Sequence, residues 1–204
     1  MPYLVAITGA SGSGKSTALD VLRGSGYRVM DLDAYAVQVI REAGSPVVTR
    51  LEQILGIPVT DRGVIDVKKI GTYFDNNRDE EVRFEAWFQA YVGKRIRVAL
   101  ARLQGGGVIF ADAPFMRQRN LTGTFDMIWL ITADPAACES RLRLRNGYDY
   151  EKIKYLIERS AVSEAIYQKP VMAIANNGSM EEYRHSVLAA AAAVSANWLP
   201  YWQE

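Results

Sequence analysis

Short runs of apolar residues recur along the chain, separated by longer segments in which apolar positions follow helical spacing. Consecutive apolar residues are typical of strands covered on both faces, as in a parallel sheet. The pattern predicts strands at residues 4–8, 27–31, 107–112, 125–132 and 170–175. It predicts helices at residues 16–23, 34–43, 48–55, 65–74, 80–103, 134–144, 150–168 and 180–198, with Gly93 interrupting the longest and a loop at 56–63.

This alternation predicts an α/β fold, with a five-stranded parallel sheet flanked by helices on both faces. No repeat or low-complexity linker divides the chain, so we expect one domain over residues 1–204. The roughly sixty residues between the second and third strands are too many for one ordinary crossover. We therefore expect residues 44–105 to form a helical insertion that covers a second ligand.

The first strand leads into a glycine-rich segment, Gly9 to Thr17, with the spacing G-x-x-x-x-G-K-S. A strand before it and a helix after it favour a P-loop over a glycine-rich turn that binds nothing. In a P-loop, backbone N–H groups and the helix N-terminus bind phosphates, the lysine reaches the β- and γ-phosphates, and the serine hydroxyl faces Mg²⁺. We therefore expect the P-loop NTPase fold, with ATP and Mg²⁺ as cofactors. The predicted nucleotide-binding residues here are Gly12, Ser13, Gly14, Lys15, Ser16 and Thr17, with Lys15 also catalytic and Ser16 also a metal ligand.

Acidic residues end two of the predicted strands. Asp31 and Asp33 follow the second strand, and Asp112 ends the third. Ligands bind at the carboxyl edge of a parallel sheet, so we expect these acids near the P-loop. Asp33 is a candidate to accept the proton of an acceptor hydroxyl; the alternative is that one or both of Asp31 and Asp33 cap the next helix. Asp112 has the position of a Walker B aspartate, which holds Mg²⁺ through water, although strands often end in Asp.

An arginine pair follows the fourth strand. Arg141 and Arg145 are four residues apart, so they share one face of a helix. Such a helix is either a solvated basic surface or a lid that brings arginines to the transferring phosphoryl group. Because a P-loop precedes it, we favour a lid over residues 135–168, with Arg141 as a catalytic residue and Arg145 as a nucleotide contact.

Composition narrows the class of partner. A formal net charge of +1 provides no field to attract nucleic acid, and no apolar run is long enough to span a bilayer. One cysteine, Cys138, excludes an internal disulfide, and one histidine, His185, excludes a multi-histidine metal site. We expect a cytoplasmic enzyme with a small-molecule acceptor, no nucleic-acid or membrane partner, and a monomeric or weakly homo-oligomeric state.

Taken in order, the motifs resemble one family, dephospho-coenzyme A kinase, over residues 3–190. The likeness starts with the P-loop opening from Ile7 to Thr17. Asp31 to Asp33 is similar to the family's D-A-D motif, Gly44 to Pro46 to its G-x-P motif, and Gly63 to Phe74 to its G-x-L-D-R segment. Further along the chain, Asp112 to Pro114 is similar to its D-x-P-L-L motif, Arg141 to Arg145 to its R-L-x-x-R motif, and Asn176 to Gly178 to its N-x-G motif.

This resemblance implies transfer of the γ-phosphoryl group of ATP to the 3′-hydroxyl of dephospho-CoA, which gives CoA. It assigns Asp33 to the acceptor hydroxyl, Lys15 to the phosphates and Arg141 to the lid. It also implies that Asn177 and Gly178 contact the nucleotide near the adenine. The helical insertion would hold the acceptor.

On the acceptor side the chain departs from the family pattern. It has Gln89-Ala90 where the family has His-Pro, and Gln118 where the family has the glutamate of P-L-L-x-E. Two other functions therefore stay open: a divergent P-loop kinase for another nucleotide-like or small hydroxyl acceptor, and a non-catalytic ATP-binding regulatory protein.

Overall fold

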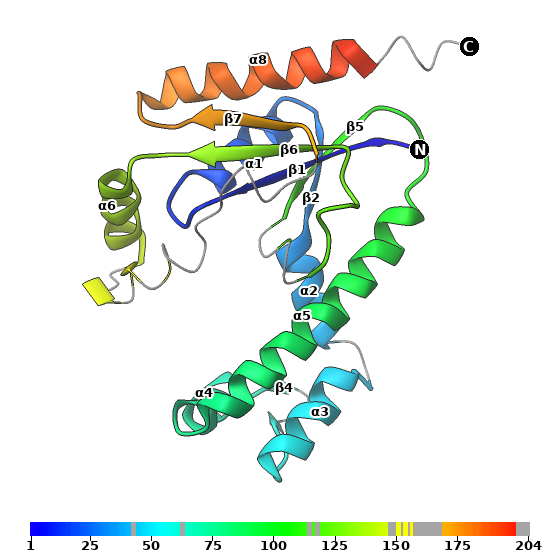
Figure 1. Ribbon diagram of the computed structural model, residues 1–204, viewed down its shortest axis with the longest axis vertical. Coiled ribbons are helices and arrows are strands. Elements are labelled where there is room, and N and C mark those ends of the chain that lie inside the picture. Colours follow the sequence, from blue (N-terminus) through cyan, green and yellow to red (C-terminus); the bar gives the residue numbers. More distant parts are fainter. Residues whose placement is uncertain are drawn as a thin grey trace.

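The computed structural model describes residues 1–41, 44–61, 64–113, 116, 119–146, 150–151, 153–154, 156 and 169–198. A central sheet lies between two layers of helices, and a helical insertion extends from one side (Figure 1). The strands are β1 (Tyr3–Gly9), β2 (Arg28–Asp31), β3 (Thr60–Asp61), β4 (Val64–Ile65), β5 (Val108–Asp112), β6 (Met127–Thr132) and β7 (Val171–Ala175). The helices are α1 (Lys15–Gly24), α2 (Leu32–Arg41), α3 (Pro46–Leu55), α4 (Val67–Asp75), α5 (Arg78–Ala101), α6 (Pro135–Asn146) and α8 (Met180–Trp198).

The main sheet has the strand order β2-β5-β1-β6-β7, and all of its pairs are parallel. This confirms the five-stranded parallel sheet predicted from the sequence. Strand β1 lies at the centre, between β5 and β6, so the loop that follows it opens where the strand order changes direction. That point at the carboxyl edge is where open α/β sheets bind ligands.

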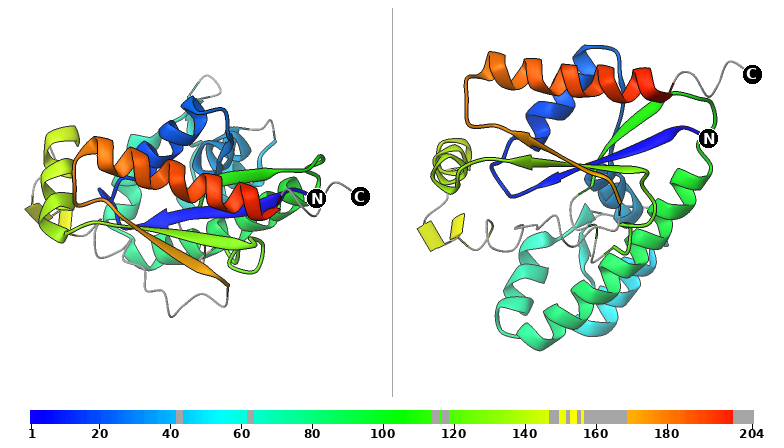
Figure 2. Two further views of the ribbon diagram at one scale, coloured as in Figure 1. Left: turned by 90° about the horizontal axis from the view of Figure 1, so that it is seen from above. Right: turned by 45° about the horizontal axis from the view of Figure 1, so that its top comes forward.

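Alternate residues of β1 supply the two sides of the core. Leu4 and Ala6 pack on the face covered by α2 and α5, whereas Val5 and Ile7 pack on the face covered by α1 and α8. Figures 1 and 2 show these helices on opposite sides of the sheet. Full burial of an aliphatic side chain such as Ile7 contributes about 1.5–3 kcal/mol, so both faces stabilise the strand that carries the loop.

The insertion has a small core of its own. Its buried side chains come from α3, α4 and the segment between α3 and β3: Val47, Leu51, Leu55, Val59 and Phe74. Aromatic side chains from the first half of α5 pack against this core, whereas Val92, Ile96 and Leu100 from its second half pack against the sheet. One helix therefore belongs to both the insertion and the main core.

The structure corrects three predicted elements. Residues 60–61 form β3, which pairs antiparallel with β4, where the sequence predicts a loop; strands of two residues are too short to show a periodic pattern. Helix α5 runs through Gly93 without a break. Helix α2 begins at Leu32, two residues earlier than predicted. The predicted second lid helix, 150–168, lies mainly outside the described residues.

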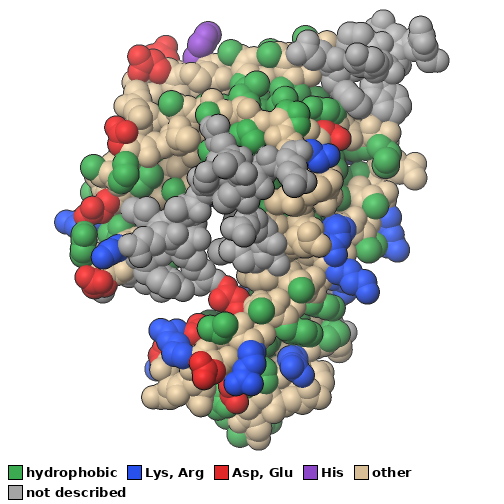
Figure 3. Space-filling model, in the orientation of Figure 1, with side chains coloured by type: hydrophobic (Ala, Val, Ile, Leu, Met, Phe, Trp, Pro, Cys, Tyr) green, Lys and Arg blue, Asp and Glu red, His purple; other side chains and the backbone are tan. Residues whose placement is uncertain are grey.

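The surface agrees with the balanced charge of the chain. On the lower part of the face in Figure 3, which the insertion forms, acidic and basic side chains lie interspersed. The one histidine, His185, is exposed on α8. Among the described helices, none has the length and apolarity that a membrane span requires.

Candidate active site

The loop between β1 and α1 needs glycine for both conformation and space. Gly12 and Gly14 have φ angles of 80° and 108°, a region that side chains with a Cβ rarely adopt. A Cβ on Gly12 would lie 2.6 Å from the carbonyl oxygen of Cys138, and one on Gly14 would lie 2.2 Å from Nδ2 of Asn176. The loop is therefore packed closely against α6 and against the residue that follows β7.

Lys15 is the first residue of α1, and its side chain folds back over the loop. Its Nζ donates hydrogen bonds to the carbonyl oxygens of Gly9 and Ala10, both at 2.9 Å. Burial lowers the pKa of Lys15, while the carboxylates of Asp112 and Asp33 act in the opposite direction. The loop carbonyls therefore hold the ammonium group in place.

Three residues distant in sequence hold the loop from outside. Asn176 donates from Nδ2 to the carbonyl oxygen of Ser13 at 2.7 Å, and Tyr183 donates from Oη to that of Gly14 at 3.1 Å. Arg141 donates from Nη1 to the carbonyl oxygen of Gly12 at 3.3 Å and from Nη2 to that of Asn176 at 2.9 Å. The predicted lid arginine therefore contacts the P-loop directly.

Asn176 and Tyr183 were not among the predicted site residues. Asn176 had a signal, because it is the first residue of the N-x-G segment. Tyr183 had none, because its hydroxyl reaches the loop across 169 residues of sequence. Burial raises the pKa of Tyr183, so its hydroxyl keeps the proton that it donates.

The side chain of Asn177 is hydrogen-bonded to Asp134. Its Oδ1 accepts from the backbone N–H of Asp134 at 2.8 Å, and its Nδ2 donates to the Asp134 carboxylate at 3.2 Å. These bonds tie the end of β7 to the start of α6. Contact with adenine stays a prediction for Asn177, and the side chain of Arg145 lies outside the described part of the structure.

A cavity of about 760 Å³ opens above the P-loop. Most of the predicted site residues line it: Gly12, Gly14, Lys15, Ser16, Thr17, Asp33, Arg141 and Gly178. Asn176 lines it too, whereas Ser13 is buried and is not part of the cavity wall. One space thus joins the P-loop to the carboxylate of Asp33 and the guanidinium group of Arg141.

The two acids after β2 have separate contacts. Asp31 caps α2, because its Oδ1 accepts from the backbone N–H of Ala34 at 2.8 Å. This cap starts the helix at Leu32 and places Asp33 in its first turn rather than at the strand end, which corrects the prediction. The side chain of Asp33 is 50% exposed and faces the cavity. Of the two alternatives, capping therefore belongs to Asp31, and Asp33 is free of that role.

Asp112 ends β5 beside β1, as predicted for a Walker B aspartate. Burial raises its pKa to about 6, with Lys15 opposing the shift and Asp33 adding to it. Its Oδ1 is buried and has no hydrogen-bond partner among the described residues. A buried carboxylate oxygen without a partner is costly unless a ligand completes its contacts.

A buried arginine joins Asp33 to the insertion. Arg119, in the segment after β5, donates from Nη2 to Oδ1 of Asp33 and from Nε to Oε1 of Gln89, both at 2.9 Å. Its side chain is 4% exposed. Sequence reasoning missed Arg119, because an arginine in a loop carries no periodic signal and its partners lie 30 and 86 residues away.

The comparisons with known proteins identify the family of the chain. The sequence model of the dephospho-CoA kinase family matches residues 3–182. The chain belongs to the dephospho-CoA kinase family. A dephospho-CoA kinase from Synechocystis sp. is 26% identical over 190 residues, which cover 92% of this chain and 94% of that protein.

Two solved structures extend the comparison. The first, of TT1252 from Thermus thermophilus, is 26% identical with a TM-score of 0.72 and covers 95% of this chain and 97% of that one. The second, of a dephospho-CoA kinase from Campylobacter jejuni, has the same fold at 17% identity, with a TM-score of 0.63 over 96% of this chain and 98% of that one.

One residue that differs from the pattern of the dephospho-CoA kinase family makes a hydrogen bond in the structure. Gln89, in place of the family's histidine, is buried and accepts from Arg119. Gln118, in place of the family's glutamate, lies outside the described residues. The change at residue 89 therefore lies within the hydrogen-bonded group that includes Asp33.

Proposed function

We propose that this protein transfers the γ-phosphoryl group of ATP to the 3′-hydroxyl of dephospho-CoA, the step that completes coenzyme A biosynthesis. The observation that carries the proposal is the single cavity in which Lys15 and the P-loop face Asp33. A phosphate-binding loop alone is compatible with a nucleotide-binding protein without turnover. An exposed acid in the lining of the same cavity adds what an acceptor hydroxyl requires.

The P-loop half of the cavity suits a nucleoside triphosphate. Free N–H groups at the start of α1 bind phosphate oxygens, and Lys15 can exchange its carbonyl contacts for the β- and γ-phosphates. Arg141 lines the same cavity and contacts the loop, which supports a role for its charge in binding the transferring group. Phosphoryl transfer depends on such positioning and on neutralised charge rather than on covalent chemistry.

The residues present also suit Mg²⁺. Among the described residues, no group of three or more His, Cys, Asp or Glu side chains forms a metal site, so the nucleotide would supply most of the ligands. The exposed hydroxyl of Ser16 would bind the ion directly, and the carboxylate of Asp112, at the end of the strand beside β1, would hold one of its waters. When bound, the ion neutralises charge on the β- and γ-phosphates.

On the acceptor side, Asp33 is the residue that handles the proton. As the acceptor oxygen bonds to the γ-phosphorus, the bond from that phosphorus to the β–γ bridging oxygen breaks and ADP departs. The hydroxyl proton passes to the carboxylate of Asp33, which is exposed in the cavity. The same carboxylate orients the hydroxyl before transfer.

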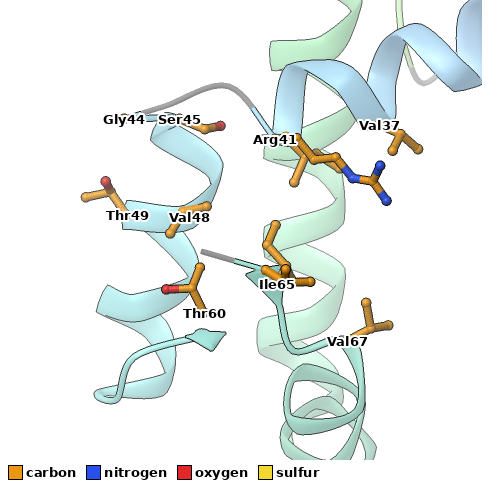
Figure 4. A pocket seen from close by; sticks show the side chains of 11 residues that line it. Val37, Arg41, Gly44, Ser45, Val48, Thr49, Thr60, Ile65 and Val67 are labelled. Carbon is orange, nitrogen blue, oxygen red and sulfur yellow. The ribbon is translucent and has the colours of Figure 1, made fainter. Parts of the chain in front are cut away.

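A second cavity, of about 800 Å³, provides a place for the rest of the acceptor. It lies between α2, α3 and the β3–β4 hairpin, and aliphatic side chains form much of its wall (Figure 4). Val37 and Arg41 line it from α2, one and two helical turns beyond Asp33. Arg41 has no ion pair or hydrogen bond with the described residues, so its charge is available to a phosphate group. We propose that the arm of dephospho-CoA runs along this face of α2.

An assay with Mg²⁺-ATP and dephospho-CoA tests the proposed function. The expected products are ADP and CoA phosphorylated at the 3′ position, identified by mass spectrometry of the acceptor. Lys15→Ala serves as the control, because loss of the P-loop cation should lower kcat on the order of 10²-fold or more. Transfer to another hydroxyl acceptor but not to dephospho-CoA would favour the divergent kinase, and ATP binding without transfer to any acceptor would favour the regulatory protein.

A further inference from the structure

Arg119 occupies a position that a purely structural role explains poorly. A guanidinium group is expensive to bury, and this one is nearly inaccessible to solvent. Its ion-pair partner, Asp33, is half exposed and lines the nucleotide cavity. The pair thus connects the interior of the protein to an acid on the wall of the site.

The backbone at Arg119 is held firmly against α5. Gly93 lets the two segments touch: a Cβ there would lie 1.9 Å from the carbonyl oxygen of Arg119. Arg97 donates from Nη1 to the carbonyl oxygens of Arg119 and Asn120, at 3.2 and 2.9 Å. Asn120 has a φ of 52°, in the left-handed region that few residues other than glycine adopt. Several contacts therefore fix where the Arg119 side chain begins.

The side chain is fixed at its other end as well. Nε donates to Gln89 while Nη2 donates to Oδ1 of Asp33, so two edges of one planar group are used at once. Lysine has a single ammonium group on a flexible stem and cannot reproduce this fork. Oδ2 of Asp33 makes no hydrogen bond with the described residues, which leaves it available to an acceptor hydroxyl.

We propose that Arg119 is a positioning residue for phosphoryl transfer, which holds Oδ1 of Asp33 so that Oδ2 faces the acceptor hydroxyl, while Gln89 fixes the guanidinium group. The inference rests on the proposed function, because it concerns the acid of that reaction. It makes α5, the helix shared by the insertion and the main core, the element that sets the geometry of Asp33. The charge of Arg119 also acts on Asp112 and lowers its pKa, against the dominant effect of burial.

A double-mutant cycle between Arg119 and Asp33 tests the proposal. Arg119→Lys keeps the charge and removes the fork, so kcat with dephospho-CoA should fall by about 10-fold to 100-fold, as small misplacements of reacting groups do. The KM for ATP should stay within about twofold, since the P-loop is untouched. In the Asp33→Asn background, Arg119→Lys should cause no further loss of kcat, because a residue that acts through Asp33 has no effect once that acid is gone.

Two more variants complete the experiment. Gln89→Met keeps the size of the side chain and removes the oxygen that accepts from Arg119, so it should also lower kcat, by a smaller factor. This variant tests the proposal if Arg119→Lys does not fold. Arg102→Lys, at the exposed C-terminal end of α5, is the matched control and should keep wild-type kinetics.

The outcomes separate the two hypotheses. A wild-type protein that does not phosphorylate dephospho-CoA overturns the proposed function together with this inference. If the wild type is active, the inference alone fails when Arg119→Lys keeps normal kcat, when it raises only the KM for dephospho-CoA, or when it costs as much in the Asp33→Asn background as in the wild type.

Discussion

Asp31 and Asp33 stand two positions apart and have different partners. Asp31 satisfies a backbone N–H at the start of α2, and Asp33 pairs with a buried arginine and faces the cavity. A substitution at each position should therefore change a different property of the protein, stability in one case and turnover in the other.

Asp33→Asn should lower kcat by about 10²-fold or more while ATP affinity holds, because an amide cannot accept the acceptor proton. The amide oxygen can still accept from Arg119, so we expect only a modest fall in Tm. Asp31→Ala should do the reverse, with a loss of about 0.5–2 kcal/mol in unfolding free energy and normal kcat. Melting curves, ATP titrations and turnover measurements on both variants test these expectations. Normal turnover in Asp33→Asn would show that Asp33 has no role in the reaction.

The carboxyl group of Asp112 predicts a stability that depends on pH. Its folded pKa of about 6 lies above the ordinary value of 3.8, so ionisation destabilises the fold. The sign follows: its favourable contribution is complete below pH 4 and is lost as the pH rises to about 6. The full shift corresponds to roughly 3 kcal/mol.

Asp112→Asn removes the buried charge, so at pH 7 without ligands the variant should melt several degrees above the wild type, at about 2–4 °C per kcal/mol. At pH 4 the difference should shrink, because the wild-type carboxyl group is then neutral. Turnover with Mg²⁺-ATP should fall at the same time, since Asn cannot replace a carboxylate beside the metal. Calorimetry at the two pH values would contradict the assignment if Asp112→Asn were less stable at both.

At the scale of the elements, the P-loop is held in its conformation by residues of other helices and strands. Helix α6 contributes Arg141, α8 contributes Tyr183, and the residue after β7 contributes Asn176, each of which donates to a loop carbonyl. Each of these bonds leaves the loop N–H groups available, because a carbonyl and not an N–H is used. These three bonds thus fix the loop through its carbonyl groups, so they do not occupy the N–H groups that would bind phosphate.

Arg141→Ala should reduce kcat more than it weakens ATP binding, because a guanidinium group near the γ-phosphoryl gains most of its interaction in the transition state. Arg143→Ala is a matched control on the same helix, since Arg143 pairs with Glu139 at the surface and should leave kinetics unchanged. Steady-state kinetics with varied ATP measure both. A rise in the KM for ATP alone would make Arg141 a ground-state contact.

The sequence predicted those helices and strands whose formation depends on residues close together in the chain. The five strands of the sheet, α1 and α8 follow from apolar runs, helix-breaking glycines and helical spacing, and the P-loop follows from its own spacing. The β3–β4 hairpin and the early start of α2 were missed because a short pairing and a single side-chain cap decide them. Gly93 is a break in the sequence pattern, but in the structure it is the position where Arg119 touches α5.

The site residues show the same difference between what depends on local sequence and what depends on distant contacts. The places of Lys15, Asp33, Arg141 and Asp112 near the P-loop could be predicted because each lies in a motif or at a strand end, and their roles stay predictions. Arg119, Asn176 and Tyr183 could not be assigned roles, since each acts on a partner more than 80 residues away. Cytoplasmic location and the monomeric or weakly oligomeric state stay predictions.

At the scale of the whole molecule, the cavity beside α2 and α3 is distinct from the one above the P-loop, so we expect a change there to affect binding of dephospho-CoA and not of ATP. Thr49→Trp places a large side chain at the exposed wall of that cavity and should raise the KM for dephospho-CoA by about tenfold while the KM for ATP is unchanged. An acceptor without the arm, such as 5′-AMP, should be unaffected. Gln53→Trp adds the same side chain to α3 outside the cavity and serves as the control. Equal effects on both acceptors would place the arm elsewhere.

The central position of β1 also affects how the chain is made. Its hydrogen-bonding neighbour β5 begins 105 residues later, since Tyr3 pairs with Val108. At a synthesis rate of about 5–20 residues per second, the first strand leaves the ribosome roughly 5–20 s before any partner strand in the middle of the sheet exists. During that interval its apolar residues and both of its edges are unprotected. We therefore expect the strand that carries the P-loop to depend on protection by other contacts during translation.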